Sequence, residues 1–223
     1  GVVISASHNL FEDNGIKFFN LNGQKFSAEL EKRIENKLTE QVKTVKSLNL
    51  GKASRMEDAQ GRYIEFCKSK FIDLNLGNLS ILLDCAHGAT YSVAPKVFEE
   101  LGANITTIGT KPDGININKD CGSTNPEFLR EEILKGVYDL GIAFDGDGDR
   151  IVVVTKEGKI LDGDDLIYVL CNQLPQGKSV VGTLMSNKAL EIELKSKNLN
   201  FYRADVGDKF VLDKMIEKES MLG

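Results

Sequence analysis

Apolar and polar positions along the chain form two alternating patterns, short apolar runs and amphipathic segments of about ten residues. The apolar runs are GVVISA, LSILLD, NITTIG, LGIAF, IVVV, SVVGT and NFYRA. Runs of this length, bounded by glycine and polar residues, are typical of buried strands. Between them, SVAPKVFEELG and NKALEIELKSK have apolar residues every three or four positions, which predicts helices.

A further helix is predicted near the start of the chain. Ser27 is a suitable N-cap for it. Leu30, Ile34 and Leu38 follow at intervals that place them on one buried stripe. Residues 41–61 then lapse into small and charged residues, a pattern typical of a linker. We therefore expect a domain boundary near residue 57.

Strands and helices alternate in two similar units after this linker. Such alternation predicts right-handed βαβ connections. The expected fold class is therefore α/β, with consecutive small domains built on mixed, mostly parallel sheets covered by helices. Each unit is too short for a dinucleotide-binding domain of about 150 residues. We predict the segments 1–57, 58–155 and 156–223, with chemistry at strand ends or between segments.

Composition narrows the range of functions without selecting one. The chain is 41% hydrophobic, so it can bury real cores and disorder is not expected. Its net charge of −5 argues against binding nucleic acid or an anionic membrane, and no apolar stretch approaches the ~20 residues of a membrane span. A small-molecule partner is favoured, with no nucleic acid and no membrane. The four cysteines lack CxxC spacing, which favours reduced, cytoplasmic thiols.

The strongest local signal is the acidic loop in LGIAFDGDGDRIVVV. Asp145, Asp147 and Asp149 occupy alternate positions, spaced by glycines that tolerate positive φ. Three carboxylates a few Å apart repel by about 4 kcal/mol per pair at an effective dielectric near 20. A hard divalent cation would offset that repulsion, whereas a solvated Asp-Gly hairpin turn is the alternative that the loop alone leaves open.

Spacing separates this loop from two other acidic motifs. An EF-hand counted from Asp145 needs glycine at its sixth position and glutamate at its twelfth. The chain has Arg150 and Lys156 there. A haloacid-dehalogenase-like phosphatase would use Asp145 as its nucleophile with Asp147 two residues later. Asp149 stands where that class usually has threonine, which weakens this alternative without removing it.

The end of the first strand carries Ser7 and His8, and Lys17 follows in DNGIK. Each of these residues alone has an ordinary structural explanation, for example a hydrogen-bonded histidine. Together with the other motifs they become informative. SASHN, DNGIK, DGDGDR, GTLMSN and VGDKF, in this order, resemble the α-D-phosphohexomutase superfamily, and the similarity extends over essentially the whole chain.

The resemblance implies a phosphoserine mechanism. In such enzymes the serine of SASHN, here Ser7, carries a phosphoryl group, and the three aspartates of DGDGDR bind Mg²⁺ together with a phosphoserine oxygen. A phosphoserine adds a charge of about −1.5 to −2, so it needs the metal beside three carboxylates. His8 and Lys17 match acid/base or charge-stabilising positions, with their roles undivided. The implied cofactors are one Mg²⁺ per active site and phosphorylated Ser7.

Substrate contacts and a reaction follow from the same resemblance. Arg150 matches an arginine suited to bidentate phosphate binding, and Arg203, Asp208 and Lys209 lie in a loop that faces the sugar. Within the superfamily the chain is most similar to enzymes that interconvert glucosamine 6-phosphate and glucosamine 1-phosphate through a 1,6-bisphosphate, for UDP-N-acetylglucosamine synthesis. The alternatives are action on mannose or glucose phosphate and a non-catalytic sugar-phosphate-binding module. The resemblance is compatible with a homodimer.

The chain departs from the family pattern at one position of the serine motif. Leu10 stands where SASHNP has proline, which is expected to loosen the loop by about 0.4 to 1 kcal/mol through unfolded-state entropy. By resemblance, the chain corresponds to the end of a first domain, a whole second and most of a third. The sugar-specificity loop is expected after Gly223, so the activity of these residues on their own is left open.

Overall fold

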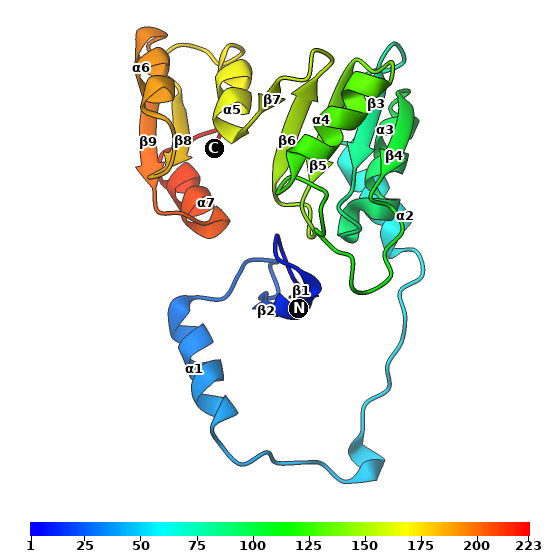
Figure 1. Ribbon diagram of the computed structural model, residues 1–223. Coiled ribbons are helices and arrows are strands. Elements are labelled where there is room, and N and C mark those ends of the chain that lie inside the picture. Colours follow the sequence, from blue (N-terminus) through cyan, green and yellow to red (C-terminus); the bar gives the residue numbers. More distant parts are fainter.

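The computed structural model describes residues 1–223 and contains three sheets in series along the chain (Figure 1). The first is an antiparallel hairpin of β1 (Val2–Ser5) and β2 (Gly15–Phe18), followed by α1 (Ala28–Leu38). An extended linker leads to the second unit, and the third follows it directly. The predicted α/β class is confirmed. None of the helices is both long and apolar enough to cross a membrane.

The second unit is built on a five-stranded mixed sheet in the order β4-β3-β5-β6-β7. Its elements are α2 (Ala59–Lys68), β3 (Ser80–Asp84), α3 (Ala94–Glu100), β4 (Asn104–Ile108), α4 (Pro126–Lys135), β5 (Leu140–Phe144), β6 (Ile151–Thr155) and β7 (Ile160–Leu161). The pairs β3–β4 and β3–β5 are parallel, whereas two hairpins make β5–β6 and β6–β7 antiparallel. Because β7 pairs with β6, the sheet of the second unit includes residues that follow the boundary expected after residue 155.

Both faces of this sheet are covered by helices. Successive side chains of a strand point to opposite faces, so Ile81 and Leu83 pack on one side with Phe98 of α3. Leu82 packs on the other side with Leu129 of α4. Since the central strands β3 and β5 are buried on both faces, the polar residues that follow them are placed at the ends of the strands. The acidic loop follows one such end, that of β5.

The third unit is a parallel β8–β9 pair packed with helices. Its elements are α5 (Gly163–Cys171), β8 (Ser179–Thr183), α6 (Lys188–Ser196), β9 (Asn200–Ala204) and α7 (Asp208–Glu217). Val180 of β8 is buried with Leu190 and Leu194 of α6. The strand, helix and strand predicted here from the sequence are confirmed.

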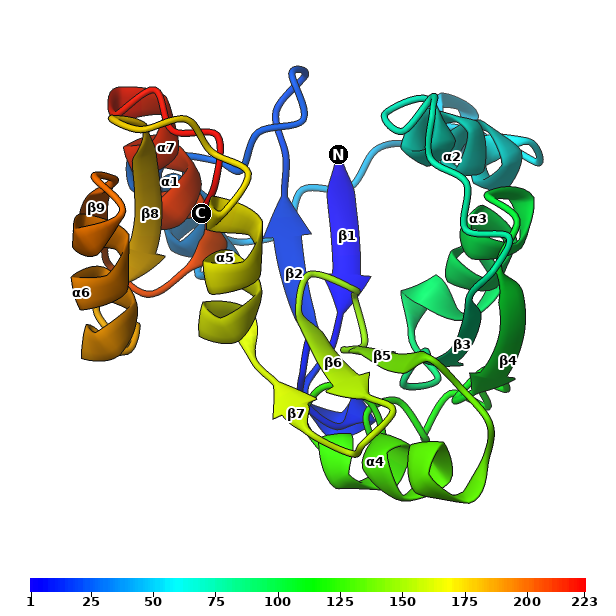
Figure 2. The ribbon, with the colours of Figure 1, turned by 90° about the horizontal axis from the view of Figure 1, so that it is seen from above.

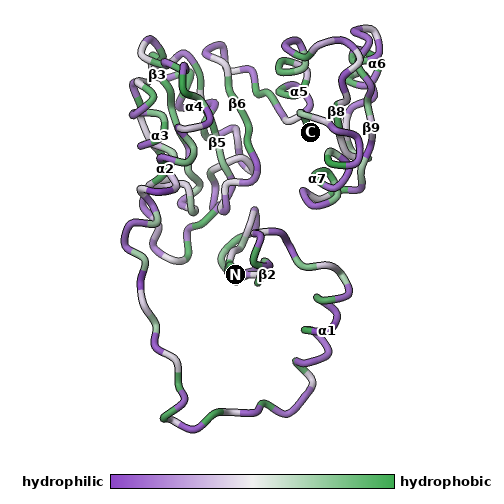
Figure 3. Tube along the Cα trace, turned by 180° about the vertical axis from the view of Figure 1, so that it is seen from behind, coloured by the Kyte–Doolittle hydropathy of each residue, from purple (hydrophilic) through white to green (hydrophobic).

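The buried stripe predicted on α1 is wrong. Ser27 caps the helix as expected, because its side chain accepts a hydrogen bond from the Leu30 N–H. No residue of α1 is buried, however, and Leu38 is 81% exposed. In Figure 3, α1 and the linker stand apart from the two units in which the apolar strands gather. Ile34 and Leu38 line a pocket together with Ile16 and Phe18 of β2, so they face the hairpin without being buried against it. The linker is also shorter than predicted, because α2 already begins at Ala59.

The hairpin of the first unit lies between the other two units (Figure 2). On one side it meets the second unit, where Lys17 of β2 pairs with Asp147. On the other side Lys25 pairs with Asp208 of α7, with 2.6 Å between Nζ and Oδ1. The end of β1 therefore lies between the second and third units, beside the loop that follows β5.

Candidate active site

Ser7 follows β1 in a constrained turn. Its φ of 52° lies in the left-handed region, which costs a non-glycine residue about 1–2 kcal/mol. The Ser7 N–H donates to Ser5 Oγ at 2.8 Å, and the Asn9 N–H donates to the Ala6 carbonyl at 2.9 Å. Ala6 is buried beneath the turn, while Ser7 stays partly exposed. Backbone strain of this kind is typical of functional sites.

His8 and Lys17 contact different groups near this turn: His8 lies beside the serine, and Lys17 contacts the aspartates. His8 Nδ1 is 3.4 Å from Ser7 Oγ, a long contact of the kind that tightens when substrate binds. Lys17 Nζ is 2.5 Å from Asp147 Oδ2 and 3.8 Å from Asp149 Oδ2. Burial would lower the pKa of Lys17, but the contacts with the two carboxylates outweigh it and raise that pKa above its ordinary value. Lys17 is therefore held as a cation, and His8 is the better placed to exchange a proton with the serine.

The acidic loop brings three carboxylates to one point. Ligand oxygens of Asp145, Asp147 and Asp149 lie within 4.8 Å of one another. Gly148 has φ of 77°, the conformation that the sequence predicts for both glycines of the loop. Gly146 has a different role, because a Cβ built on it would lie 2.5 Å from the carbonyl oxygen of Ser7. The loop and the serine turn are thus in direct contact through a position where only glycine fits.

The burial of the carboxylates supports a cation site. Asp145 is 0% exposed, and its Oδ1 accepts from the N–H groups of Gly148 and Arg150 at 3.1 Å. Asp145 Oδ2 and Asp147 Oδ1 are buried without any donor, an arrangement that is costly unless a cation or donor is supplied. Three clustered carboxylates, two of them with a buried oxygen that lacks a donor, are a set of oxygen ligands that Mg²⁺ prefers, so the residues present fit that ion.

A second buried carboxylate shows that burial alone does not leave carboxylate oxygens without donors. Asp84 is also 0% exposed, but its Oδ1 accepts from the Ala86 N–H at 2.9 Å and its Oδ2 from the Gly122 N–H at 2.7 Å. Burial raises the pKa of both Asp84 and Asp145. In Asp145 the neighbouring charges of the loop add to that effect. In Asp147 the bond to Lys17 outweighs burial, so its pKa is lowered.

The other predicted substrate contacts are distributed unevenly around this centre. Arg150 is exposed, and only its backbone N–H is used, by Asp145. Asp208 pairs with Lys25, and that hydrogen bond lowers its pKa. Lys209 Nζ donates to the carbonyl of Phe26 at 3.0 Å. Arg150 thus has a free guanidinium, whereas Asp208 and Lys209 hold the third unit against the segment after β2.

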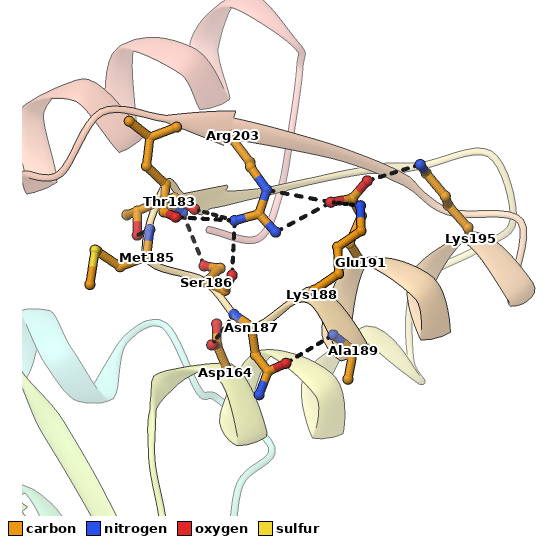
Figure 4. A network of polar contacts seen from close by, with 11 residues as sticks. Asp164, Thr183, Met185, Ser186, Asn187, Lys188, Ala189, Glu191, Lys195 and Arg203 are labelled. Atoms are coloured by element: carbon orange, nitrogen blue, oxygen red, sulfur yellow. Dashed lines mark hydrogen bonds and ion pairs between the residues drawn. The ribbon is translucent and has the colours of Figure 1, made fainter.

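Arg203 is not free to bind a ligand as the structure has it (Figure 4). Its Nη1 donates to the carbonyls of Thr183 at 2.9 Å and Ser186 at 2.8 Å. Its Nη2 lies 3.2 Å from Glu191 Oε2, and Glu191 is in turn paired with Lys195. The guanidinium therefore fixes the loop between β8 and α6, and its predicted contact with the sugar would require these bonds to open.

Replacing Arg203 by glutamine is expected to lower the free energy of unfolding by about 2 to 3 kcal/mol, because two loop carbonyls lose a charged donor. Arg62 provides the matched control, since its ion pair with Asp58 is exposed on both sides. Arg62→Gln should cost less than about 1 kcal/mol. Denaturant unfolding of both variants measures the difference. Equal, small losses would mean that the Arg203 bonds are not structural.

At Leu10, where the chain departs from the family pattern, the backbone has a conformation that proline could also adopt. Leu10 has φ of −71°, close to the value that a proline ring imposes. Its side chain is 46% exposed, and its N–H donates no hydrogen bond. The substitution therefore removes no contact of the turn, and its effect is confined to the entropy of the unfolded chain.

Sequence reasoning does not single out Asn118, which the structure places against the serine turn. Its side-chain amide donates to the carbonyls of Ser7 and Asn9, each at 2.7 Å. Asn118 lies in DGININKDCGSTNPE, a stretch that also carries the family resemblance. Nothing local separates it from the other asparagines of that loop, so only a tertiary contact reveals it.

Comparison with known proteins follows the order of the three units. Profiles of the phosphoglucomutase/phosphomannomutase family match the chain in three parts, each described as an alpha/beta/alpha domain: domain I over residues 1–44, domain II over 61–158 and domain III over 162–223. The phosphoglucosamine mutases of Legionella pneumophila (strain Corby) and Cronobacter sakazakii (strain ATCC BAA-894) are each 53% identical over 100% of the chain. The chain spans about half the length of these curated relatives, 50% and 51%.

Solved structures show the same fold. A phosphoglucomutase/phosphomannomutase family protein from Burkholderia thailandensis matches with a TM-score of 0.77 at 23% identity, over 100% of this chain and 48% of that one. An N-acetylglucosamine-phosphate mutase of the α-D-phosphohexomutase superfamily, solved in its substrate complex, matches with a TM-score of 0.69 at 18% identity. That match covers 97% of this chain and 58% of the other. At these identities the two structures support the fold alone.

Proposed function

Because the chain belongs to the phosphoglucomutase/phosphomannomutase family, we propose that the protein carrying it is a phosphoglucosamine mutase. The proposed reaction interconverts glucosamine 6-phosphate and glucosamine 1-phosphate. The observation that carries the proposal is the contact between the Ser7 turn and a loop whose buried carboxylate oxygens lack donors. Relatives at 51–53% identity that are named phosphoglucosamine mutase support the choice of substrate over mannose or glucose phosphate.

In this proposal Ser7 carries the phosphoryl group, and Asp145, Asp147 and Asp149 hold Mg²⁺. The ion, when bound, supplies positive charge that stabilises the phosphoryl oxygens during transfer. Phosphoryl transfer asks a protein mainly for alignment and electrostatic stabilisation. The strained Ser7 turn provides the alignment, because its carbonyl is seated on the loop that would hold the metal.

The chain's own cations and bases complete the step. The hydroxyl at O1 of glucosamine 6-phosphate attacks phosphorus and the bond from phosphorus to Ser7 Oγ breaks. The proton of the hydroxyl is passed to Oγ, so that the bisphosphate and an unmodified serine form. We assign that proton transfer to His8, which lies beside Oγ. Lys17 stabilises negative charge while it stays paired with Asp147. After the bisphosphate has turned around in the site, the second step moves its phosphate at O6 to Ser7 and leaves glucosamine 1-phosphate. The free guanidinium of Arg150 would bind the phosphate that does not react.

Three further parts of the proposal concern the surroundings of the reaction. The partner is an amino-sugar phosphate, and the product would feed UDP-N-acetylglucosamine synthesis. A cytoplasmic location is supported by the four cysteines, all of which are free thiols. Asp208, Lys209 and Arg203 remain proposed sugar contacts only if their present bonds open. A homodimer and the boundaries after residues 57 and 155 stay predictions.

A coupled assay of the protein carrying this chain tests the proposal. The assay supplies Mg²⁺, a trace of glucosamine 1,6-bisphosphate and, in parallel, glucosamine 6-phosphate, mannose 6-phosphate or glucose 6-phosphate. We expect kcat/KM for glucosamine 6-phosphate to exceed that for the other two by at least about tenfold, the scale of the net contribution of one hydrogen bond. Faster turnover of mannose or glucose phosphate would overturn the substrate, and no turnover of any would overturn the mutase.

A further inference from the structure

Asn118 joins the serine turn to the frame of the second unit. The two protons of its side-chain amide go to two different carbonyls, those of Ser7 and Asn9, at 2.7 Å each. These acceptors flank the serine motif and lie 111 and 109 residues away in the sequence. One side chain therefore forms hydrogen bonds to the residues on both sides of His8.

The anchor of this side chain is itself rigid. Asn118 is 6% exposed, and its backbone N–H donates to the carbonyl of Ala86 at 2.9 Å, just after β3. Its φ of 56° is in the left-handed region, which asparagine tolerates better than most residues. The side chain thus starts from a fixed point just beyond the end of β3, a strand paired on both sides.

The acidic loop lies against both Ser7 and Asn118. A Cβ built on Gly146 would lie 2.5 Å from the Ser7 carbonyl oxygen and 2.7 Å from Asn118 Nδ2. The carbonyl of Ser7, the amide of Asn118 and the backbone of the acidic loop are therefore stacked in one place. A shift of the asparagine would move the serine relative to the three aspartates.

We propose that Asn118 is a positioning residue that fixes the Ser7 turn against the acidic loop. It touches neither the reacting oxygen nor the proposed metal ligands, and it acts through the carbonyls of Ser7 and Asn9. The inference rests on the proposed function, in which transfer depends on the placement of Ser7 Oγ beside the aspartates. A misplacement of about 1 Å can cost roughly 100-fold in rate.

Asn118→Gly tests the proposal, because glycine keeps the left-handed backbone and removes only the amide. Asp120→Gly is the matched control, since Asp120 has φ of 57°, lies in the same loop and is exposed. We expect kcat of Asn118→Gly to fall by about 10- to 100-fold, with KM for glucosamine 6-phosphate within about threefold. Asp120→Gly should keep wild-type kinetics.

Hydrogen exchange of the amides of residues 6–10 gives a readout that does not depend on turnover. In Asn118→Gly we expect exchange to be about tenfold faster, because the turn loses two hydrogen bonds to the second unit. In Asp120→Gly it should be unchanged. Exchange that stays at the wild-type rate in Asn118→Gly, or kinetics equal to those of Asp120→Gly, would overturn the positioning role.

The two proposals fail in distinguishable ways. If the wild-type protein neither turns over glucosamine phosphate nor acquires phosphate on Ser7, the proposed function fails. Hydrogen exchange then decides alone whether Asn118 fixes the turn: faster exchange in Asn118→Gly supports it and unchanged exchange overturns it. If the wild-type protein is active and Asn118→Gly is equally active, only the positioning role fails.

Discussion

Replacing Ser7 by glycine is expected to abolish interconversion of glucosamine 6-phosphate and glucosamine 1-phosphate, by about 10⁴-fold or more, as loss of a nucleophile does elsewhere. The reason is that Ser7 Oγ is the atom proposed to carry the phosphoryl group. Stability should barely change. Relief of the strain at φ 52°, worth about 1–2 kcal/mol, offsets the entropy of glycine, about 0.5–1 kcal/mol.

Peptide mass spectrometry and denaturant unfolding check this result together. The wild-type protein, incubated with the 1,6-bisphosphate, should carry phosphate on the peptide that contains Ser7. The glycine variant should carry none and unfold within about 1 kcal/mol of wild type. Ser7→Ala, which keeps the strain, should be equally inactive and less stable than Ser7→Gly. Phosphate on Asp145 would instead support the phosphatase alternative, and turnover by Ser7→Gly would remove the serine from the mechanism.

Local pattern was sufficient for the strands and for the acidic loop. The apolar run that ends at Phe144 is a buried strand, and the alternate spacing of Asp145, Asp147 and Asp149 gathers their oxygens within 4.8 Å. Both results follow from properties of neighbouring residues. A strand directs alternate side chains to opposite faces, and a glycine-spaced loop turns within a few residues.

Properties that depend on distant partners could not be predicted. Arg203, Asp208 and Lys209 were expected to face a sugar, but their acceptors and partners come from other elements that no local pattern announces. The stripe of α1 is a correct helical pattern, but its residues line pockets beside β2 and α7 and none of them is buried. Amphipathic spacing identifies a face able to be buried, and only the tertiary arrangement decides whether it is.

The two glycines of the acidic loop illustrate the same limit. In sequence Gly146 and Gly148 are equivalent, each between two aspartates. Gly148 supplies a positive φ, a local property that the sequence predicts. Gly146 is needed because the Ser7 carbonyl and the Asn118 amide leave no room for a Cβ. That requirement comes from residues more than 25 positions away. The role of Asn118 likewise depends on partners 111 and 109 residues away, which no local pattern predicts.

Asp145→Asn is expected to lower turnover and to raise the free energy of unfolding of the metal-free protein. Without metal, burial and then the charges of Asp149 and Asp147 raise the pKa of Asp145. Ionising Asp145 therefore costs more free energy in the folded protein than in the unfolded chain. This penalty on stability is absent below the ordinary pKa and develops as pH rises through the raised pKa. Asparagine removes that charge, keeps an acceptor for the Gly148 and Arg150 N–H groups and adds a donor. We expect the metal-free variant to be more stable than wild type by about 1 kcal/mol.

With Mg²⁺ the order should reverse. At a concentration of about 100 times Kd, the ion should stabilise the wild-type protein by about 2.7 kcal/mol, and Asp145→Asn should lose most of this gain. Turnover should fall by at least about 100-fold, the scale of losing one electrostatic contact in a transition state. Thermal unfolding and the coupled assay, each with and without Mg²⁺, measure the two effects.

Asp84→Asn makes the same chemical change at a buried carboxylate whose two oxygens already have donors. The variant places an amide N–H against an existing donor, so it should destabilise the protein by about 1–3 kcal/mol with or without the ion. Its response to Mg²⁺ should match that of wild type. An Asp145→Asn variant that responds to Mg²⁺ as strongly as Asp84→Asn would show that the acidic loop is not the metal site. A metal-free Asp145→Asn variant less stable than wild type would mean that the unpaired carboxylate oxygens of the loop do not destabilise the fold.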